Sequence, residues 1–247
     1  MNSLKKFIPR SVAVSIAPVS DRIIDFACTI GLVQDPQQMT VGDTTARYRV
    51  TSASERWRVQ QYMGEKDIIE AIVSEVRPDD CFWDVGAAVG TYSCIVANAG
   101  ATVVAFEPHE GNYKRCLENT RLNGISIITK QLALSDTAGQ LKLKEDRTVG
   151  SGMHQVSEEG ALEISTVRGD EVDVPDPTII KIDVEGHELK VLEGLGDRLD
   201  TVRKIYIECH PGLGVTKEAV TQQLTARGFS VTIHKIDRSE PYLIRTK

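Results

Sequence analysis

The pattern of apolar and polar positions changes near residue 80. Beyond it, short apolar runs alternate with amphipathic segments that end at glycine or Asn-Gly, which predicts strands alternating with helices. The expected strands are 81–85, 102–107, 125–133, 178–183 and 204–209, and the expected helices lie within 86–100, 109–124, 188–195 and 216–228. Residues 229–236 and 241–246 are typical of a closing antiparallel pair, whereas 137–168 are less regular. This order predicts an α/β fold with a doubly wound, mostly parallel sheet covered on both faces.

Residues 1–76 follow a different pattern. Residues 40–51 predict a short hairpin with its turn at Gly42-Asp43, and residues 53–76 predict a helix, because apolar residues recur there at helical spacing. We therefore divide the chain into an N-terminal extension, 1–76, and an α/β domain, 77–247.

The first 32 residues begin basic and then turn apolar, but charged residues and a proline interrupt the run. It falls well short of the roughly 18 apolar residues that span a bilayer. We expect a packed N-terminal helix. A surface helix that touches a membrane or a partner, and a cleaved signal peptide, are the alternatives.

Composition narrows the class of protein. The net charge of −6 and an aromatic content of 5% argue against a broad nucleic-acid surface and against stacking platforms for bases. The five cysteines are scattered and contain no C-x-x-C, so neither a disulfide framework nor a zinc site is indicated. We expect reduced thiols in a cytoplasmic protein.

A glycine loop follows the first strand of the α/β domain. In WDVGAAVGTYS, Asp84 ends the strand, and Gly86 and Gly90 bracket a turn into a helix whose free N–H groups can bind a ligand. Glu107 ends the next strand, where a carboxylate can accept both hydroxyls of an adenosine ribose. Asp84 would repel a pyrophosphate, but it suits an ammonium or a sulfonium. S-adenosylmethionine (SAM) carries both groups.

Four motifs, WDVGAAVGTYS, AFEPH, ALSD and KIDVEGHELKVLEG, together resemble the FkbM family of SAM-dependent methyltransferases over about residues 80–210. The resemblance implies the class I methyltransferase (Rossmann-like) fold, a seven-stranded sheet whose last strand is antiparallel. It also implies O-methylation of sugars or polyketide hydroxyls. One position departs from the family, which often has Asn where this chain has Ala88, so one side-chain hydrogen bond is in question.

The resemblance also assigns cofactor contacts. Gly86, Ala87 and Gly90 would line the methionine end of SAM. Asp84 would hold its amine, directly or through water, and Glu107 its ribose. Asp136 of ALSD would lie near the adenine, and a turn-capping role for this aspartate is an equal interpretation.

The segment 178–195 carries the candidate chemistry. By the resemblance, Asp183 lies between cofactor and acceptor, and Glu185 or His187 is the base that removes a proton from an alcohol. Acidic residues are also favoured at a helix start, so Glu185 has a purely structural interpretation. Asp183, Glu185 and His187 could also form a metal site, but their spacing is not diagnostic and we expect no metal.

Two further residues extend this candidate site. Glu208 and His210, at the end of the fifth strand, could reach the acceptor pocket as well. Acceptor-pocket residues are otherwise expected within 1–76 and 145–170, where no motif guides their choice.

The sequence thus predicts a SAM-dependent O-methyltransferase that acts on a hydroxyl or carboxyl of a sugar, glycan or secondary metabolite. Methylation of RNA or protein, and a SAM-binding module without activity, are the alternatives. We expect a small-molecule or glycan acceptor, no nucleic acid, and at most peripheral contact with the inner face of a membrane through the N-terminal helix. Acceptor identity and oligomeric state are not encoded in any motif.

Overall fold

A seven-stranded sheet forms the centre of the protein, which is represented by a computed structural model. The structure describes residues 22–28, 30–60, 65–144, 155–156, 159–235 and 242–246. The strand order is β12-β13-β11-β10-β3-β4-β5. The strands are β3 (Cys81–Val85), β4 (Thr102–Phe106), β5 (Ile128–Lys130), β10 (Ile179–Ile182), β11 (Lys204–Cys209), β12 (Val231–Lys235) and β13 (Tyr242–Thr246).

Neighbouring strands from β11 to β5 are parallel, and β13 alone is antiparallel to both of its neighbours. The predicted doubly wound sheet with an antiparallel last strand is therefore confirmed. Every residue of β3 and β10 is buried, as expected for central strands covered on both faces.

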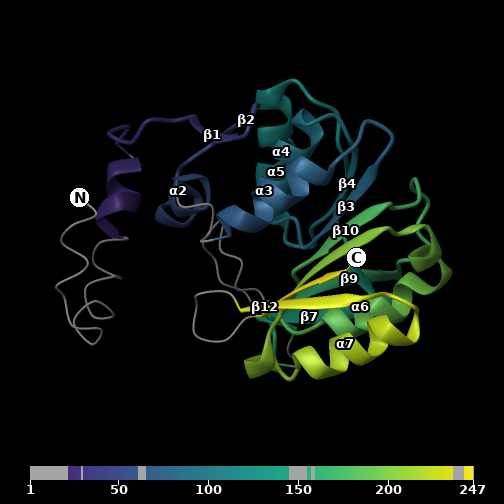
Figure 1. Cartoon of the computed structure of the whole chain (residues 1–247). Coiled ribbons are helices and arrows are strands. Elements are labelled where there is room, and N and C mark those ends of the chain that lie inside the picture. The colour runs from purple at the N-terminus through teal and green to yellow at the C-terminus, as the bar shows by residue number, and fades with distance from the viewer. Residues whose placement is uncertain are drawn as a thin grey trace.

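Helices cover the two faces of this sheet (Figure 1). The helices α3 (Lys66–Glu75), α4 (Thr91–Asn98) and α5 (Glu110–Asn123) lie on one side, and α6 (Glu188–Leu195) and α7 (Lys217–Ala226) lie on the other. Alternate strand residues divide between two cores: Trp83 and Ile180 pack on the α6–α7 side, and Phe82 and Ile179 pack on the α3–α4 side. Two short 3-10 helices, η3 (Gly196–Thr201) and η4 (Pro211–Leu213), flank β11.

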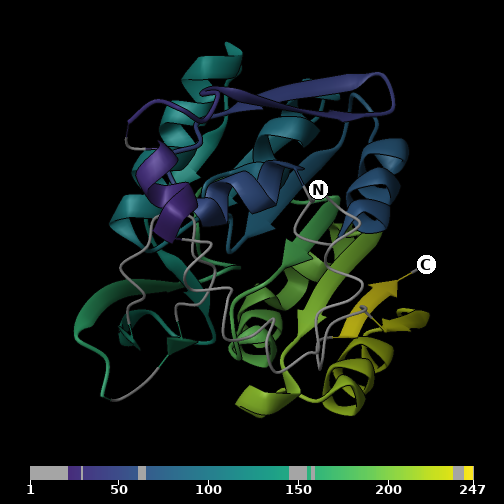
Figure 2. The ribbon, with the colours of Figure 1, turned by 90° about the vertical axis from the view of Figure 1, so that its left-hand side faces the viewer.

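The N-terminal extension packs onto this layer. Strands β1 (Gln37–Val41) and β2 (Thr44–Tyr48) form the predicted hairpin, which Figure 2 shows across the helices on this side of the sheet. The predicted helix 53–76 is instead two helices, α2 (Ala53–Gln60) and α3, and α3 starts afresh after Glu65. The predicted N-terminal helix falls largely outside the described residues, although 22–28 are helical and Asp25 accepts a hydrogen bond from the first amide of α2.

A second sheet was not predicted. It has the order β6-β9-β7-β8, from β6 (Ala133–Ser135), β7 (Gly139–Lys144), β8 (Gln155–Val156) and β9 (Leu162–Arg168). The expected strand 125–133 is therefore wrong as one element, because β5 and β6 belong to different sheets. No glycine, proline, asparagine or aspartate marks the break, but Ile127 packs toward the α3–α4 core and Leu132 toward the α6–α7 core.

A close contact joins the second sheet to α6. A Cβ atom on Gly194 would lie 1.8 Å from the carbonyl oxygen of Ser135 in β6, so only glycine fits at this place. We expect Gly194→Ala to lower the free energy of unfolding by about 2–3 kcal/mol, because backbone would have to move. Urea denaturation measures the loss, and Glu193→Ala on the exposed side of the same helix is the control. Equal stability of both variants would contradict the close packing.

Candidate active site

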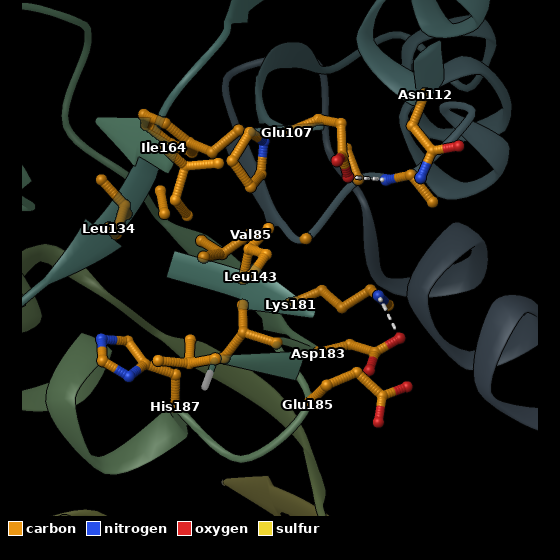
Figure 3. Close-up of a pocket in the computed structure, with 18 of the residues that line it drawn as sticks. Val85, Glu107, Asn112, Leu134, Leu143, Ile164, Lys181, Asp183, Glu185 and His187 are labelled. Carbon is orange, nitrogen blue, oxygen red and sulfur yellow. Dashed lines mark hydrogen bonds and ion pairs between the residues drawn. The ribbon is translucent and has the colours of Figure 1, made fainter. Parts of the chain in front are cut away.

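A cleft opens at the carboxyl ends of β3, β4 and β10 (Figure 3), the edge where ligands bind in open α/β sheets. It encloses about 820 Å³, including its open mouth. Gly86, Ala87 and Glu107 line it on one side, and Asp183 and Glu185 on another. The structure thus brings these five predicted site residues to one cleft.

The glycine loop is shaped by its neighbours. Gly86 has a φ of +85°, and a Cβ there would lie 1.9 Å from the carbonyl oxygen of Asp183. Gly90 precedes α4 with a φ of +78°, and a Cβ there would lie 2.7 Å from the Cys116 sulfur. Gly90 is not in the cleft lining, so packing against α5 accounts for this glycine, whereas Gly86 joins the loop to the end of β10.

Ala88 also departs from ordinary backbone geometry. Its φ is +48°, in the left-handed region that Asn and Gly tolerate best. This gives a physical reason why an Asn would suit the position. The Ala88 amide still donates a hydrogen bond to Glu107 Oε2 at 2.8 Å, so this contact between the loop and the Glu107 carboxylate does not need an asparagine side chain.

Glu107 is held rigidly at the end of β4. Its side chain is buried, Oε2 accepts from the Ala88 amide, and Oε1 accepts from the His109 amide, both at 2.8 Å. Burial raises the pKa of Glu107 to about 7, and the two amide hydrogen bonds oppose that rise. Each oxygen keeps a second lone pair for a ligand hydroxyl.

Asp84 lies beneath the loop and is not among the lining residues. Its Oδ2 accepts from Ser93 Oγ at 2.6 Å, whereas Oδ1 is buried without a hydrogen-bond partner. The nearest cation is Lys181 Nζ, 3.9 Å from Oδ1. Burial raises the pKa of Asp84, and Lys181 opposes the rise. An amine held by Asp84 would therefore have to reach it through water or through movement of the loop.

Lys181 was missed by the sequence analysis, which treated its strand as simply apolar. Its side chain is 8% exposed, and Nζ lies 3.3 Å from Asp183 Oδ2 and 4.8 Å from the centre of the Tyr92 ring. A lysine inside an apolar parallel strand was the available signal, since a buried cation needs partners. Lys181 thus connects Asp84 beneath the glycine loop to Asp183 in the cleft.

The structure brings Asp183 and Glu185 together with His210. Nε2 of His210 lies 3.9 Å from Asp183 Oδ1 and 3.5 Å from Glu185 Oε2. One ligand atom from each of the three residues lies within 4.8 Å of the others, so the group can share a proton or a cation. Glu185 has a φ of +49°, a strained conformation that for a non-glycine residue is typical of functional sites.

The two carboxylates have opposite pKa shifts. Burial would raise the pKa of Asp183, but Lys181, His210 and Arg58 together lower it, so Asp183 is ionised. Burial, and then the charge of Asp183, raises the pKa of Glu185 to about 7. The ionised Asp183 is suited to orienting a ligand, and the titratable Glu185 beside it is suited to proton transfer.

His187 and Asp136 lie apart from this group. Figure 3 shows His187 directed away from Asp183 and Glu185, and its Nε2 lies 2.9 Å from Ser135 Oγ. Burial lowers the pKa of His187. Asp136 pairs with Lys190 of α6 and is not in the cleft lining. His187 does line the cleft, but on the side of the second sheet.

Two further parts of the lining carried no sequence motif. Arg58 of α2 is buried in the wall, and its charge lowers the pKa of Asp183, Glu185 and Glu107. The second sheet adds an apolar wall that includes Leu141, Leu143 and Ile164. Arg58 and Ile164 fall inside the two regions where acceptor-pocket residues were expected.

Comparison with known proteins identifies the family. The profile of the methyltransferase FkbM domain matches residues 84–231. The chain belongs to the FkbM family of methyltransferases. The hexuronic acid methyltransferase AglP of Haloferax volcanii is 36% identical over 222 residues, which cover 88% of this chain and 92% of AglP. The 31-O-demethyl-FK506 methyltransferase FkbM of Streptomyces tacrolimicus is 28% identical over 196 residues, covering 64% of this chain and 75% of that protein.

Among solved structures, the magnesium protoporphyrin IX methyltransferase ChlM of Synechocystis PCC 6803, with bound SAM, superposes with a TM-score of 0.52. It is 11% identical, and the match covers 78% of this chain and 83% of that one, so it establishes the shared fold. Family and fold make this protein a SAM-dependent methyltransferase of class I. The predicted family, fold, enzyme class and cofactor are all confirmed.

The residues of the cleft fit SAM. Glu107 is rigid and keeps lone pairs for ribose hydroxyls, and the loop at Gly86 and Ala87 faces the cleft with its backbone. The apolar wall offers a surface for a purine ring. The acidic floor suits the positive charge of the cofactor's amine and sulfonium.

The Lys181 contacts generate a stability prediction. We expect Lys181→Met to destabilise the fold by about 3–5 kcal/mol at pH 8, because the buried Asp84 and the partly buried Asp183 lose their cation. In the wild type the lowered pKa of Asp183 means that its ionised form adds stability, and this stability is lost as the pH falls below about 4. Without Lys181 that pKa rises, so the penalty should shrink at pH 5, where Asp183 can take up a proton.

Urea denaturation at the two pH values measures both effects. Lys190→Met is the matched control, because it removes an exposed lysine that also pairs with an aspartate. An equal loss of stability in the two variants, or a Lys181→Met penalty independent of pH, would show that the ion pairs of Lys181 with Asp84 and Asp183 do not stabilise the fold.

Proposed function

We propose that this protein transfers a methyl group from SAM to an oxygen of a hexuronic acid in a glycan. Two findings support the acceptor: the similarity to the hexuronic acid methyltransferase AglP along most of both chains, and the buried Arg58 in the cleft wall. A guanidinium binds a carboxylate in a bidentate manner, and few neutral sugars would require one. The observation that carries the proposal is the Asp183–Glu185 pair in the cleft that Arg58 also lines, where the charge of Arg58 lowers the pKa of both carboxyls.

The cofactor would lie over the glycine loop. Glu107 would accept the ribose hydroxyls, and Gly86 and Ala87 would face the methionine end. Asp84 would act on the amine through water, since the loop covers it. Asp136 would contribute to the adenine end only indirectly, because its carboxylate pairs with Lys190.

The acceptor would be a hydroxyl of the sugar. When bound, SAM supplies a methyl group on a positively charged sulfur, which an oxygen nucleophile can displace. Glu185 would take the hydroxyl proton, and its pKa near 7 matches that task. Asp183, kept ionised by Lys181, would orient the hydroxyl, and proximity would supply much of the acceleration. His187 would be a pocket residue and not the base, because it faces Ser135.

A carboxyl of the hexuronic acid is the second candidate, and Arg58 favours it as well. A carboxylate acceptor needs no base. The negative charge of an ionised Glu185 would instead repel the carboxylate of the acceptor. The two candidates therefore give opposite dependence of activity on pH.

Residues 1–76 would form the acceptor-side cap of the methyltransferase domain 77–247, since α2 brings Arg58 to the cleft. No helix in the described part of the chain is long and apolar enough to span a bilayer. Ile23, Phe26 and Leu32 are more than half exposed and would allow peripheral contact with the inner face of a membrane, which suits a lipid-linked glycan. Action in the cytoplasm is part of the same proposal.

The cofactor contact can be tested without an acceptor. We expect Glu107→Ala to weaken binding of S-adenosylhomocysteine by about 30- to 150-fold, because hydrogen bonds between a charged group and the ribose hydroxyls are lost, worth about 2–3 kcal/mol. Calorimetric titration measures the affinity. Glu110→Ala, an exposed glutamate three residues further on, should bind as the wild type does. Unchanged affinity in a folded Glu107→Ala protein would remove Glu107 from the site.

The base can be tested on hexuronic acid glycans with labelled SAM. We expect Glu185→Gln to lower kcat about 100-fold or more while S-adenosylhomocysteine still binds, since general bases contribute about 10²–10⁴ in rate. Wild-type kcat/KM should rise through pH 7, where Glu185 ionises, and the variant should lose this rise.

The product separates the two acceptor oxygens. A methyl ether survives mild alkali, whereas a methyl ester is hydrolysed. An alkali-labile product whose formation falls as the pH rises through 7 would contradict the hydroxyl and establish the carboxyl. Transfer to RNA or protein, with none to uronic acid sugars, would establish the alternative acceptor class. Binding of SAM with no transfer to any acceptor would indicate a module without activity.

A further inference from the structure

A buried glutamate, Glu188, contacts the His210 ring on the side away from Asp183 and Glu185. Glu188 is the first residue of α6, and its side chain is 0% exposed. Its Oε1 accepts the Gly186 amide at 3.1 Å and lies 2.6 Å from His210 Nδ1. A carboxylate oxygen has no proton to donate, so Nδ1 of the imidazole is the donor and carries a proton. Nε2 then lies on the side of Asp183 and Glu185, which line the cleft, whereas His210 itself does not line it.

That second nitrogen faces two carboxylates. Glu185 Oε2 lies 3.5 Å from Nε2, and Asp183 Oδ1 lies 3.9 Å from it. A neutral imidazole with its proton on Nδ1 would point a lone pair at both oxygens. An imidazolium instead points an N–H between them, and is attracted by both. The geometry therefore favours the doubly protonated ring.

The other groups around His210 also favour the protonated ring. The titratable and charged groups around His210 are Glu188 from α6, Asp183 and Glu185 after β10, Glu208 of β11, and, next to these carboxyl groups, Lys181 and Arg58. Burial raises the pKa of Glu208 to about 9, so it is protonated at neutral pH, but the other three carboxyl groups still outnumber the two cations. Burial alone would lower the pKa of His210, but the Glu188 hydrogen bond and the charges of Asp183 and Glu185 raise it to about 9.

We propose that Glu188 keeps His210 as an imidazolium and that His210 is a positioning residue, which holds the Asp183 and Glu185 carboxylates toward the acceptor. Glu185 needs such support, because it lies in a strained left-handed conformation beside another carboxylate. The inference rests on the proposed function in one respect, namely that Glu185 contacts the acceptor. It adds a requirement for a proton on His210 that no motif of the sequence encodes.

The protonation state can be measured without any acceptor. In nitrogen NMR of the full chain, with His210→Gln used to assign the signals, the His210 ring should carry protons on both nitrogens at pH 7.5. In Glu188→Gln the amide keeps the hydrogen-bond acceptor but removes the charge, so we expect titration to move toward the ordinary pKa of about 6.5. A neutral His210 ring in the wild type at pH 7.5 would overturn the proposal.

Kinetics at two pH values then test the role of that proton. At pH 6 the Glu188→Gln ring is still mostly protonated, and we expect kcat within about threefold of the wild type. At pH 8 it is mostly neutral, and kcat should fall at least about tenfold relative to the wild type. His210→Gln should be impaired at both pH values. Glu193→Gln, an exposed glutamate on the same helix, should follow the wild type throughout.

The outcomes distinguish the proposals. An equal loss in Glu188→Gln at pH 6 and pH 8 would mean that Glu188 serves only the fold. Activity that requires a divalent cation and is abolished by a chelator would also overturn the inference, because an ion would then hold the carboxylates. If the wild type methylates no uronic acid glycan, the proposed function fails, and the NMR titration alone decides the state of His210.

Discussion

The active site depends on one buried cation between two strand ends. Lys181 of β10 stands opposite Asp84 in the register of β10 and β3, and its ammonium also reaches Asp183. Burying three charges costs more than burying apolar side chains of the same size, so stability alone does not explain them. The cation allows two carboxylates to remain close together at the strand ends, Asp84 beneath the glycine loop and Asp183 in the cleft.

The other charges of the cleft follow from this arrangement. Asp183 is ionised because Lys181 is near. Burial, and then the charge of Asp183, raises the pKa of Glu185 to about 7 and that of Glu208 to about 9. His210 then meets an excess of negative charge. The acids and bases of the site therefore differ in pKa although they lie close together. Each of these groups has its protonation state set by its neighbours, and the close approach of Gly86 to the Asp183 backbone joins them to the glycine loop.

Much of the fold could be predicted because its signals are local. Strand periodicity and glycine turns gave the parallel sheet, and Glu107 was found because it directly follows a strand. The second sheet could not be predicted, since no turn residue marks the break between β5 and β6. His187 was the wrong histidine to place beside Glu185: Gly186, at a φ of +97°, turns the chain so that His187 starts α6. His210 and Arg58 arrive from distant segments, and only tertiary structure shows how they approach.

The second sheet separates the shape of the pocket from its chemistry. Leu141, Leu143 and Ile164 stand on strands that do not carry the charged residues of the floor. Substitutions in this wall can widen or narrow the pocket while the carboxylates keep their geometry. An enzyme built in this way can change the width of its pocket during evolution while its acid–base groups stay in place.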